Sequence, residues 1–283
     1  MFADEVVGSL QVNGIQVGFV RSGKPSSTPT LVLLHGFTGS ASGWGSLLDE
    51  FVNAGICVIA LDMLGHGRSS APDDPARYSI EHCHADILAA LQQLGVAPQQ
   101  AVLLGYSMGG RIALFTALST SFRALILESA SPGLAQEEER VQRRQSDNAL
   151  ADRIEREGVP AFIDYWQDIP LFASQQRILP AQRMAQRTQR LNNNATGLAN
   201  SLRGVGTGVQ PALHHRLHEL HMPTLLIAGA LDSKFSSIAQ QMAREIPVSQ
   251  LAIVADAGHA VHLEQPARFL SLICNTLPIF IAP

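Results

Sequence analysis

Short, uninterrupted apolar segments constrain the fold of this chain more than any other feature. In Thr30 to Leu34 every residue after the first is apolar, which is typical of a strand covered on both faces. Similar segments follow at residues 56–61, 101–104, 124–127, 224–228 and 251–254. Most are separated by turns or by segments of helical periodicity, of which the helical candidates are residues 79–94, 109–118, 236–245 and 266–277. This alternation predicts an α/β fold with a mostly parallel central sheet flanked by helices.

Two parts of the chain depart from this alternation. Val6 to Val20 contains two apolar, β-branched stretches around Asn13-Gly14, a dipeptide that adopts the positive φ values of a tight turn, and this predicts a β-hairpin. From residue 131 to about 221 the strand signals stop, and Arg, Gln, Glu and Asn predominate. We expect an inserted helical cap at 131–221 over a core domain of residues 1–130 and 222–283. The alternative is a helical insertion without a role in ligand binding.

The overall composition favours a globular protein that binds small molecules. Hydrophobic residues make up 46% of the 283 residues and charged residues 16%, far from the composition of disordered chains. A formal net charge of -4 gives no basic field for a phosphate backbone, so no nucleic acid partner is expected. Lysine occurs only at Lys24 and Lys234, and the remaining cations are arginines, which suit bidentate recognition of carboxylates.

The sequence also favours a cytoplasmic location. Cys57, Cys83 and Cys274 are odd in number and widely spaced, so neither a disulfide framework nor a zinc knuckle is indicated. Residues 1–5 lack a basic region followed by an apolar stretch and do not resemble a signal peptide. No apolar run approaches the roughly 20 residues that span a bilayer, so we expect no membrane insertion. Oligomeric state is not indicated.

The run Gly105-Tyr106-Ser107-Met108-Gly109 is the strongest candidate for a chemical site. It has the G-x-S-x-G pattern, follows the apolar segment 101–104 and precedes the helical run 110–118. A sharp strand-to-helix turn that presents a reactive serine requires this context, and the glycines allow the turn to close. An ordinary Gly-Ser turn is the weaker alternative. Ser107 is therefore the candidate nucleophile or base.

A reactive serine needs a histidine to accept its proton and a carboxylate to orient that histidine. In folds with this turn the chain order is Ser, Asp or Glu, His, with the last two in loops after later strands. His259 follows the last predicted strand and Asp232 follows the one before it. We therefore predict a catalytic triad of Ser107, Asp232 and His259. Glu128 is the alternative acid, whereas Asp256 lies too near His259 in sequence to be preferred.

Backbone N–H groups are the expected donors to a developing oxyanion. One comes from the residue after the serine, Met108, and the other from the loop after the first parallel strand, at Phe37. Phe37 lies in His35-Gly36-Phe37, where the glycine lets the backbone approach a ligand. A simple turn at the strand end is the alternative.

The remaining histidines and glycine-rich loops do not indicate a metal or cofactor. His66, in the glycine-rich loop 62–69, is expected to be structural, and His262 to lie in a loop or behind the site. Four more histidines have helical spacing but no H-E-x-x-H motif, and we expect them to be solvated. They are His214, His215, His218 and His221. Neither a Walker loop nor a G-x-G-x-x-G after a strand occurs.

Several motifs together resemble one family of the α/β-hydrolase fold. Residues 105–111 (GYSMGGR) followed by 128–134 (ESASPGL) resemble the 2-succinyl-6-hydroxy-2,4-cyclohexadiene-1-carboxylate (SHCHC) synthases of menaquinone and phylloquinone biosynthesis. The likeness covers most of the chain from about residue 30 to 269 and continues through 140–147, 166, 170–173, 190–194, 197–199 and 232–235. One departure is Ala230-Leu231, where family members often have a charged residue before the aspartate, and we expect little consequence.

The resemblance implies a lyase that eliminates pyruvate from 2-succinyl-5-enolpyruvyl-6-hydroxy-3-cyclohexene-1-carboxylate without a cofactor. Ser107 would act as a base toward a ring proton, through His259 and Asp232. The N–H groups of Phe37 and Met108 would stabilise the enolate.

Arginine side chains are the candidate ligands for the carboxylates of such a substrate. Arg111 lies one helical turn beyond Ser107, so it can face the same pocket. The resemblance adds Arg143 and Arg190 as carboxylate ligands, with Tyr106 and Trp166 lining the site. The alternative for each cap arginine is a solvated position paired with acids such as those at 137–139.

Two other functions share these residues. A serine hydrolase acting on an ester or a carbon–carbon bond would use the same triad but would need acyl transfer or a serine-activated water. A non-enzymatic receptor would keep the scaffold for ligand capture.

Overall fold

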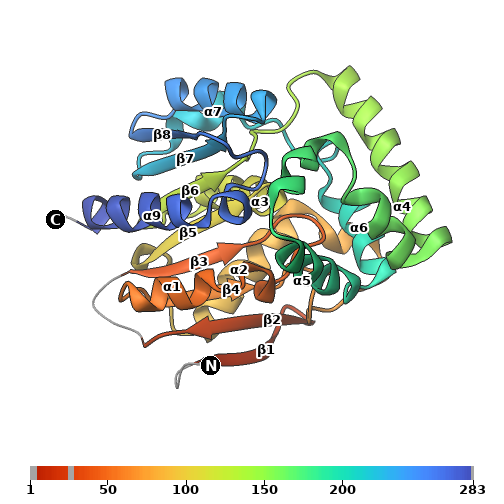
Figure 1. Ribbon diagram of the computed structural model, residues 1–283, viewed down its shortest axis with the longest axis horizontal. Coiled ribbons are helices and arrows are strands. Elements are labelled where there is room, and N and C mark those ends of the chain that lie inside the picture. The colour runs from red at the N-terminus through yellow and green to blue at the C-terminus, as the bar shows by residue number, and fades with distance from the viewer. Residues whose placement is uncertain (1–4, 25–28, 282–283) are drawn as a thin grey trace.

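A computed structural model describes residues 5–24 and 29–281 of the chain. Residues 1–4, on which most of the expectation about a signal peptide rests, lie outside this range. Figure 1 shows a central sheet with helices on both faces and a group of helices gathered at one end of the sheet.

One sheet contains the eight strands found within the described residues, in the order β1-β2-β4-β3-β5-β6-β7-β8. The hairpin strands β1 and β2 are antiparallel with Val12 opposite Ile15, so the turn lies at Asn13-Gly14 as predicted. β2 is also antiparallel to β4, whereas every neighbouring pair from β4 across to β8 is parallel. The strands are β1 (Val6–Val12), β2 (Ile15–Ser22), β3 (Thr30–Leu34), β4 (Val58–Leu61), β5 (Ala101–Tyr106), β6 (Ala124–Glu128), β7 (Thr224–Gly229) and β8 (Ser249–Val254).

Helices cover both faces of the sheet. On one face α2, α3 and α7 share a hydrophobic cluster with Val32 and Leu34 of β3, and on the other α1 and α9 share one with Leu31 and Leu33. Because helices bury both faces of the sheet, the central strands do not alternate apolar and polar residues, and their sequences are continuously apolar. The core helices are α1 (Leu47–Asn53), α2 (Ile80–Gln93), α3 (Met108–Ser119), α7 (Ser233–Glu245), α8 (Val261–Glu264) and α9 (Pro266–Ile281).

Two features of the core differ from the prediction. The segment 251–254 was expected to be a buried strand, but β8 is an edge strand, and Leu251 and Ile253 are 39% and 38% exposed. The apolar sequence of β8 reflects strand propensity rather than burial on both faces. The short helix α1 was not predicted, because seven residues give too little periodicity for recognition.

The segment between β6 and β7 is helical, as predicted for residues 131–221, which we call the cap. Its long helix α4 is broken at Gly158, which has a φ of 79°, with Pro160 two residues later. That residues 131–221 form a separate unit remains a prediction. The cap elements are α4 (Glu137–Trp166), the 3₁₀ helix η4 (Pro170–Arg177), α5 (Pro180–Leu191), α6 (Ala195–Val205) and the 3₁₀ helix η5 (His214–Glu219).

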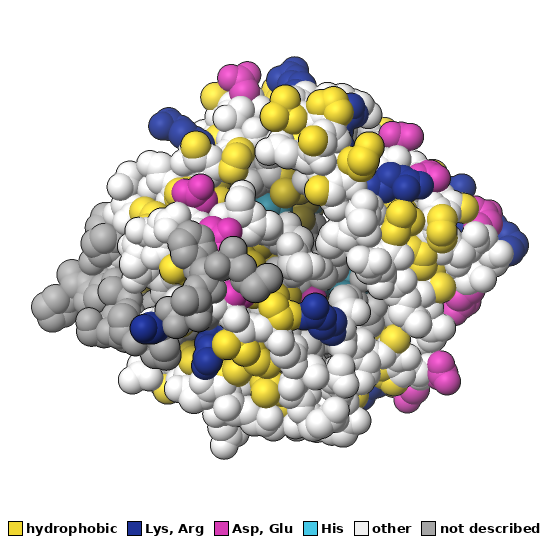
Figure 2. Space-filling model, turned by 60° about the horizontal axis from the view of Figure 1, so that its bottom comes forward, with side chains coloured by type: hydrophobic (Ala, Val, Ile, Leu, Met, Phe, Trp, Pro, Cys, Tyr) yellow, Lys and Arg dark blue, Asp and Glu magenta, His cyan; other side chains and the backbone are white. Residues whose placement is uncertain are grey.

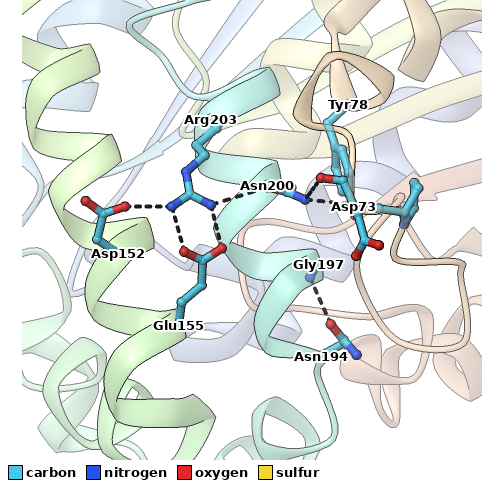
Figure 3. A network of polar contacts seen from close by, with 9 residues as sticks. Asp73, Tyr78, Asp152, Glu155, Asn194, Gly197, Asn200 and Arg203 are labelled. Atoms are coloured by element: carbon cyan, nitrogen blue, oxygen red, sulfur yellow. Dashed lines mark hydrogen bonds and ion pairs between the residues drawn. The ribbon is translucent and has the colours of Figure 1, made fainter.

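Helix α6 anchors the cap to the core (Figure 3). A Cβ atom added to Gly197 would lie 2.3 Å from the carbonyl oxygen of Gly65, so the two backbones are in direct contact. The buried Asn200 donates hydrogen bonds through Nδ2 to the carbonyl oxygens of Pro72 (3.1 Å) and Asp73 (2.9 Å). These contacts tie the loop at residues 72–73 to α6, so the position of α6 over the core is specified by hydrogen bonds as well as by packing.

Ion pairs link the helices of the cap to one another. Arg203 of α6 contacts Asp152 and Glu155 of α4, each at 2.6 Å (Figure 3). The two carboxylates are largely exposed, so each pair contributes little stability. Acidic and basic side chains lie side by side along the right of Figure 2, where α4 runs, so this surface has no field of one sign.

Within the described ranges, no helix combines the length and the hydropathy needed to cross a membrane. Cys57, Cys83 and Cys274 are all free thiols.

Candidate active site

Ser107 lies at the turn between β5 and α3 in a strained backbone conformation. Its φ is 51° and its ψ is -107°, a region that residues with a Cβ rarely occupy. Its N–H donates to the carbonyl oxygen of Glu128 on the neighbouring strand β6 at 2.9 Å. The turn therefore holds Ser107 at the N-terminus of α3 and directs its side chain away from the sheet.

The glycines of the turn are required by close backbone contacts. A Cβ atom at Gly105 would lie 2.3 Å from the carbonyl oxygen of Gly109, and one at Gly109 would lie 2.2 Å from that of Leu34. A Cβ atom at Gly110 would lie 2.6 Å from the Cβ of Ala130. No real side chain tolerates such distances, so the motif closes the turn as its sequence predicts.

His259 bridges Ser107 and Asp232. Its Nε2 lies 2.9 Å from Ser107 Oγ, and its Nδ1 lies 2.7 Å from Asp232 Oδ2. The other carboxylate oxygen, Oδ1, accepts a hydrogen bond from the N–H of Phe235 at 3.1 Å, which fixes Asp232 at the start of α7. His259 is 1% exposed and Asp232 8% exposed, so water competes little for these hydrogen bonds. The three predicted triad side chains thus form one continuous relay.

Glu128 has a different partner. It is fully buried, and its carboxylate accepts hydrogen bonds from His262 Nδ1 (2.8 Å) and from the His262 backbone N–H (2.9 Å). The His262 ring packs edge-on against Tyr106, with ring centroids 4.6 Å apart. A second carboxylate–imidazole pair therefore lies behind the first one. Asp256 is exposed in the preceding turn, so in this arrangement Asp232 is the carboxylate that reaches His259.

The loop after β3 passes directly against the Ser107 turn. A Cβ atom at Gly36 would lie 2.7 Å from the Tyr106 ring and 3.5 Å from the Cβ of Ser107. Phe37 and Met108 both line the cavity that contains Ser107. The role of their N–H groups as oxyanion donors remains a prediction.

Two buried, neutral histidines support this loop. His35 donates through Nδ1 to the Gly36 carbonyl (2.8 Å) and accepts through Nε2 from the Met63 N–H (3.0 Å), which requires one neutral tautomer. His66 donates through Nδ1 to the Leu64 carbonyl at 3.0 Å. Burial lowers the pKa of His35 to about 4 and that of His66 to about 3. Both therefore stay uncharged at neutral pH.

The cavity over Ser107 is strongly cationic. It has a volume of about 350 Å³, and Arg111, Arg143 and Lys234 line it without any aspartate or glutamate among its lining residues. Arg111 is buried and donates through Nη1 to the Val205 carbonyl (2.9 Å) and to Gln210 Oε1 (2.6 Å). It makes no ion pair with a carboxylate within the described part of the chain. Burial lowers its pKa only to about 10, so the group remains charged.

The other two cations are more accessible. Arg143 has a side chain 42% exposed and donates through Nε to Asp147 Oδ1 at 2.8 Å. Lys234 is exposed on α7, two residues after Asp232. Sequence reasoning missed Lys234 as a site residue, although it is one of only two lysines and follows the triad aspartate.

Aromatic side chains form the apolar wall of this cavity. Trp166 packs edge-on against Phe37 and Phe172, with ring centroids 5.3 and 5.8 Å apart. Tyr106 lies on the side of the cavity facing His259, and burial raises the pKa of its phenol well above the usual value. Trp166 and Tyr106 were predicted to line the site, whereas Phe172 was noted only as part of the family resemblance at 170–173 and was given no role.

Arg190 lies outside this cavity. It lines a smaller neighbouring cavity of about 50 Å³ together with Tyr106, Phe172 and His262. Its guanidinium carbon is 5.7 Å from the centre of the Phe172 ring. The structure thus gathers four of the predicted ligand-binding residues around Ser107 and leaves the fifth, Arg190, beyond Phe172.

The four histidines between 214 and 221 are exposed in and beside η5. Among the described residues, no three histidine, cysteine, aspartate or glutamate side chains are grouped so as to hold a metal ion.

Comparison with known proteins confirms the predicted fold and the family resemblance. Residues 29–266 match the family model of the α/β hydrolase fold. A Bacillus subtilis (strain 168) protein assigned as an SHCHC synthase is 43% identical over 94% of this chain and 96% of its own length. The structure of MenH from S. aureus aligns with a TM-score of 0.87 and 33% identity, over 93% of this chain and 99% of that one. A malate-bound esterase from Thermogutta terrifontis aligns with a TM-score of 0.83 and 27% identity, over 99% of this chain and 100% of the esterase chain.

The depressed pKa values of His35 and His66 predict loss of stability in acid. The unfolded chain takes up these protons near pH 6.5 and the folded chain only near pH 4 and 3, so stability falls as pH drops through this window. Each group contributes a slope of up to about 1.4 kcal/mol per pH unit. In urea unfolding between pH 7.5 and 4.5, His66→Gln is expected to flatten this dependence. The exposed His218→Gln is the matched control, and a His66→Gln slope equal to that of the wild type would contradict the account.

Proposed function

The chain belongs to the SHCHC synthase family of α/β-hydrolase-fold enzymes, and we propose that it eliminates pyruvate from 2-succinyl-5-enolpyruvyl-6-hydroxy-3-cyclohexene-1-carboxylate. This is a carbon–oxygen lyase reaction of menaquinone or phylloquinone biosynthesis. The observation that carries the proposal is a serine-histidine-aspartate relay that opens into a cationic cavity free of lining carboxylates.

Charge complementarity supports this substrate. The molecule has a ring carboxylate, a succinyl carboxylate and an enolpyruvyl carboxylate, and the cavity presents Arg111, Arg143 and Lys234. Arg111 is a buried cation with no directly bonded carboxylate in the described chain, although Asp147 lies near enough to raise its pKa, so a substrate carboxylate would supply a direct ion-pair partner. A small polycarboxylate is therefore the proposed ligand.

The relay supports proton abstraction by Ser107. With Asp232 holding the His259 Nδ1–H, the free Nε2 accepts the hydroxyl proton while Ser107 Oγ takes the ring proton beside the succinyl ketone. The electron pair of that C–H bond forms a new ring double bond, the existing double bond shifts, and the bond to the enolpyruvyl oxygen breaks. The released enolate of pyruvate takes up one proton, so atoms and charge balance. No cofactor enters this step.

Two backbone donors would stabilise the transient negative charge. As the ring proton leaves, charge develops on the succinyl ketone oxygen, and the N–H groups of Phe37 and Met108 are the proposed donors. The closeness of the Gly36 backbone to Ser107 supports this role, because it brings the loop after β3 beside the N-terminus of α3. We also propose a cytoplasmic location, which the free cysteines support.

Ester hydrolysis is the second candidate function. It is favoured by the likeness to the Thermogutta terrifontis esterase. Hydrolysis and the lyase reaction would both use a serine polarised by His259. Hydrolysis differs from the lyase reaction because Ser107 must be acylated and then released by water.

Pyruvate release from the enolpyruvyl substrate is the test of the proposed function. We expect the purified wild-type protein to release one pyruvate per substrate without added metal or nucleotide. Ser107→Ala is expected to lower kcat by about a thousandfold or more while substrate affinity changes little. A folded wild-type protein that binds the substrate but releases no pyruvate would instead support a ligand receptor and end the lyase proposal.

The two buried carboxylates are expected to differ in their effect on turnover. Asp232→Asn removes the acceptor that holds the His259 tautomer, and kcat should fall by about 10³–10⁴-fold. Glu128→Gln is the isosteric control, and its kcat should stay within about tenfold of the wild type because Glu128 contacts His262 instead. Equal losses in the two variants, measured by steady-state pyruvate release, would contradict the assignment of Asp232.

Arg111 is expected to act mainly on substrate binding. Removing a charge-assisted hydrogen bond costs about 1.5–3 kcal/mol, so Arg111→Ala should raise KM by roughly 10–100-fold. Arg156→Ala, on the exposed face of α4, is the control and should leave KM unchanged. Unchanged kinetics in a folded Arg111→Ala protein would count against carboxylate recognition by this residue.

A further inference from the structure

The cap contains a second cavity that the proposed reaction does not use. It lies between η4 and α5, has a volume of about 340 Å³ and is lined by residues that include Gln175, Arg183, Arg187 and Arg190. Phe172 lines both this cavity and the one over Ser107, so the two cavities meet at that side chain.

This cap cavity carries an excess of positive charge. Three arginines line it, against Asp168 as the single carboxylate among its lining residues. Arg187 is paired with Asp164 at 2.7 Å. In the described ranges, Arg183 and Arg190 make no ion pair with a carboxylate. Their guanidinium groups are therefore available to an anion, and the planar guanidinium fork matches a carboxylate.

Two buried donors at the same cavity lack acceptors. Gln175 is 6% exposed, and its Nε2 has no hydrogen-bond partner among the described atoms. The Nε of Arg183 is also buried without a partner there, although Nη1 of the same group donates to Gln176 Oε1. A buried donor without an acceptor is destabilising, because it has lost its hydrogen bond to water without gaining another. Both atoms are N–H donors, so a ligand that relieves this cost must bring acceptor oxygens.

We propose that the cap cavity is a second carboxylate-binding site, which holds the polycarboxylate substrate before it passes Phe172 into the catalytic cavity. The identity of the ligand as the substrate rests on the proposed function, whereas the preference for carboxylates rests on Gln175, Arg183 and Arg190. Arg190 also lies over the Phe172 ring and lines the small cavity behind Tyr106, so positive charge continues from the cap cavity toward the Ser107 turn.

Citrate binding measured by calorimetry tests the site without requiring turnover. The experiment uses protein carrying Arg111→Ala, so that carboxylate binding in the catalytic cavity is weakened. We expect Arg183→Gln to weaken the remaining citrate binding by about tenfold or more and Gln175→Leu by severalfold. Arg156→Gln on the outer face of α4 should have no effect. Circular dichroism verifies that each variant is folded.

If the Arg111→Ala protein binds no citrate, or if folded Arg183→Gln and Gln175→Leu proteins bind it as tightly as their parent, the cap cavity is not a carboxylate site. These outcomes are independent of the reaction, since a protein that fails to release pyruvate can still bind citrate through Arg183. Failure of this inference and failure of the proposed function are thus distinguishable.

Steady-state kinetics then tests the connection to the substrate. With Arg111 intact, Arg183→Gln should lower kcat/KM for the enolpyruvyl substrate about fivefold at low ionic strength. The deficit should shrink at high salt, because screening weakens the capture of a polyanion. Wild-type kcat/KM in a variant that has lost citrate binding would overturn the role of the cavity in substrate entry.

Discussion

The strained backbone at Ser107 is the constraint on which the rest of the site depends. A residue with a side chain is held at a φ of 51° because a strand must end and a helix begin within one residue. Contacts of Gly105 and Gly109 with neighbouring backbone lock this turn, and the Ser107 N–H is tied to β6. Since the surroundings over-determine the conformation, the hydroxyl is presented without waiting for a ligand. The same turn fixes Met108 beside it and Arg111 one helical turn further on.

The electrostatic arrangement separates the two signs of charge. Of the acidic groups near the site, Asp232 and Glu128 are each bonded to a histidine and Asp147 is bonded to Arg143, and none of the three lines the cavity. The cations face into it, with Arg111 and Lys234 supplied by the core and Arg143 by the cap. A polyanionic ligand therefore meets attraction from both sides, while the proton relay stays in its own buried layer. The cap therefore lines the cavity together with the core, in keeping with its proposed role in binding.

Sequence reasoning predicted the parts of the molecule that are fixed by local or repeated rules. Continuous apolar runs such as 30–34 identified strands because both faces of the sheet are covered, and the spacing around Ser107 identified the turn because only glycine fits there. The order of Ser107, Asp232 and His259 along the chain favoured this relay but left Glu128 as an alternative acid. The edge position of β8 was missed, since an exposed apolar strand and a buried one have similar sequences.

The cap was less predictable because its geometry depends on tertiary contacts. Nothing in the sequence around Arg190 shows that Phe172 stands between it and the catalytic cavity, since the two come from different elements. The pairing of Glu128 with His262 spans more than a hundred residues and has no local signature. Lys234 could have been found from its place beside Asp232, but the second cavity in the cap could not, because it is formed by side chains of η4 and α5 that meet only after folding.

The central claim is that Ser107 moves a proton and is not acylated. Rapid-quench mass spectrometry of the intact protein during turnover of the enolpyruvyl substrate tests it most directly. The account predicts that the protein keeps its unmodified mass at every time point while pyruvate accumulates. A stoichiometric adduct on Ser107 that forms and decays at the rate of turnover would contradict it.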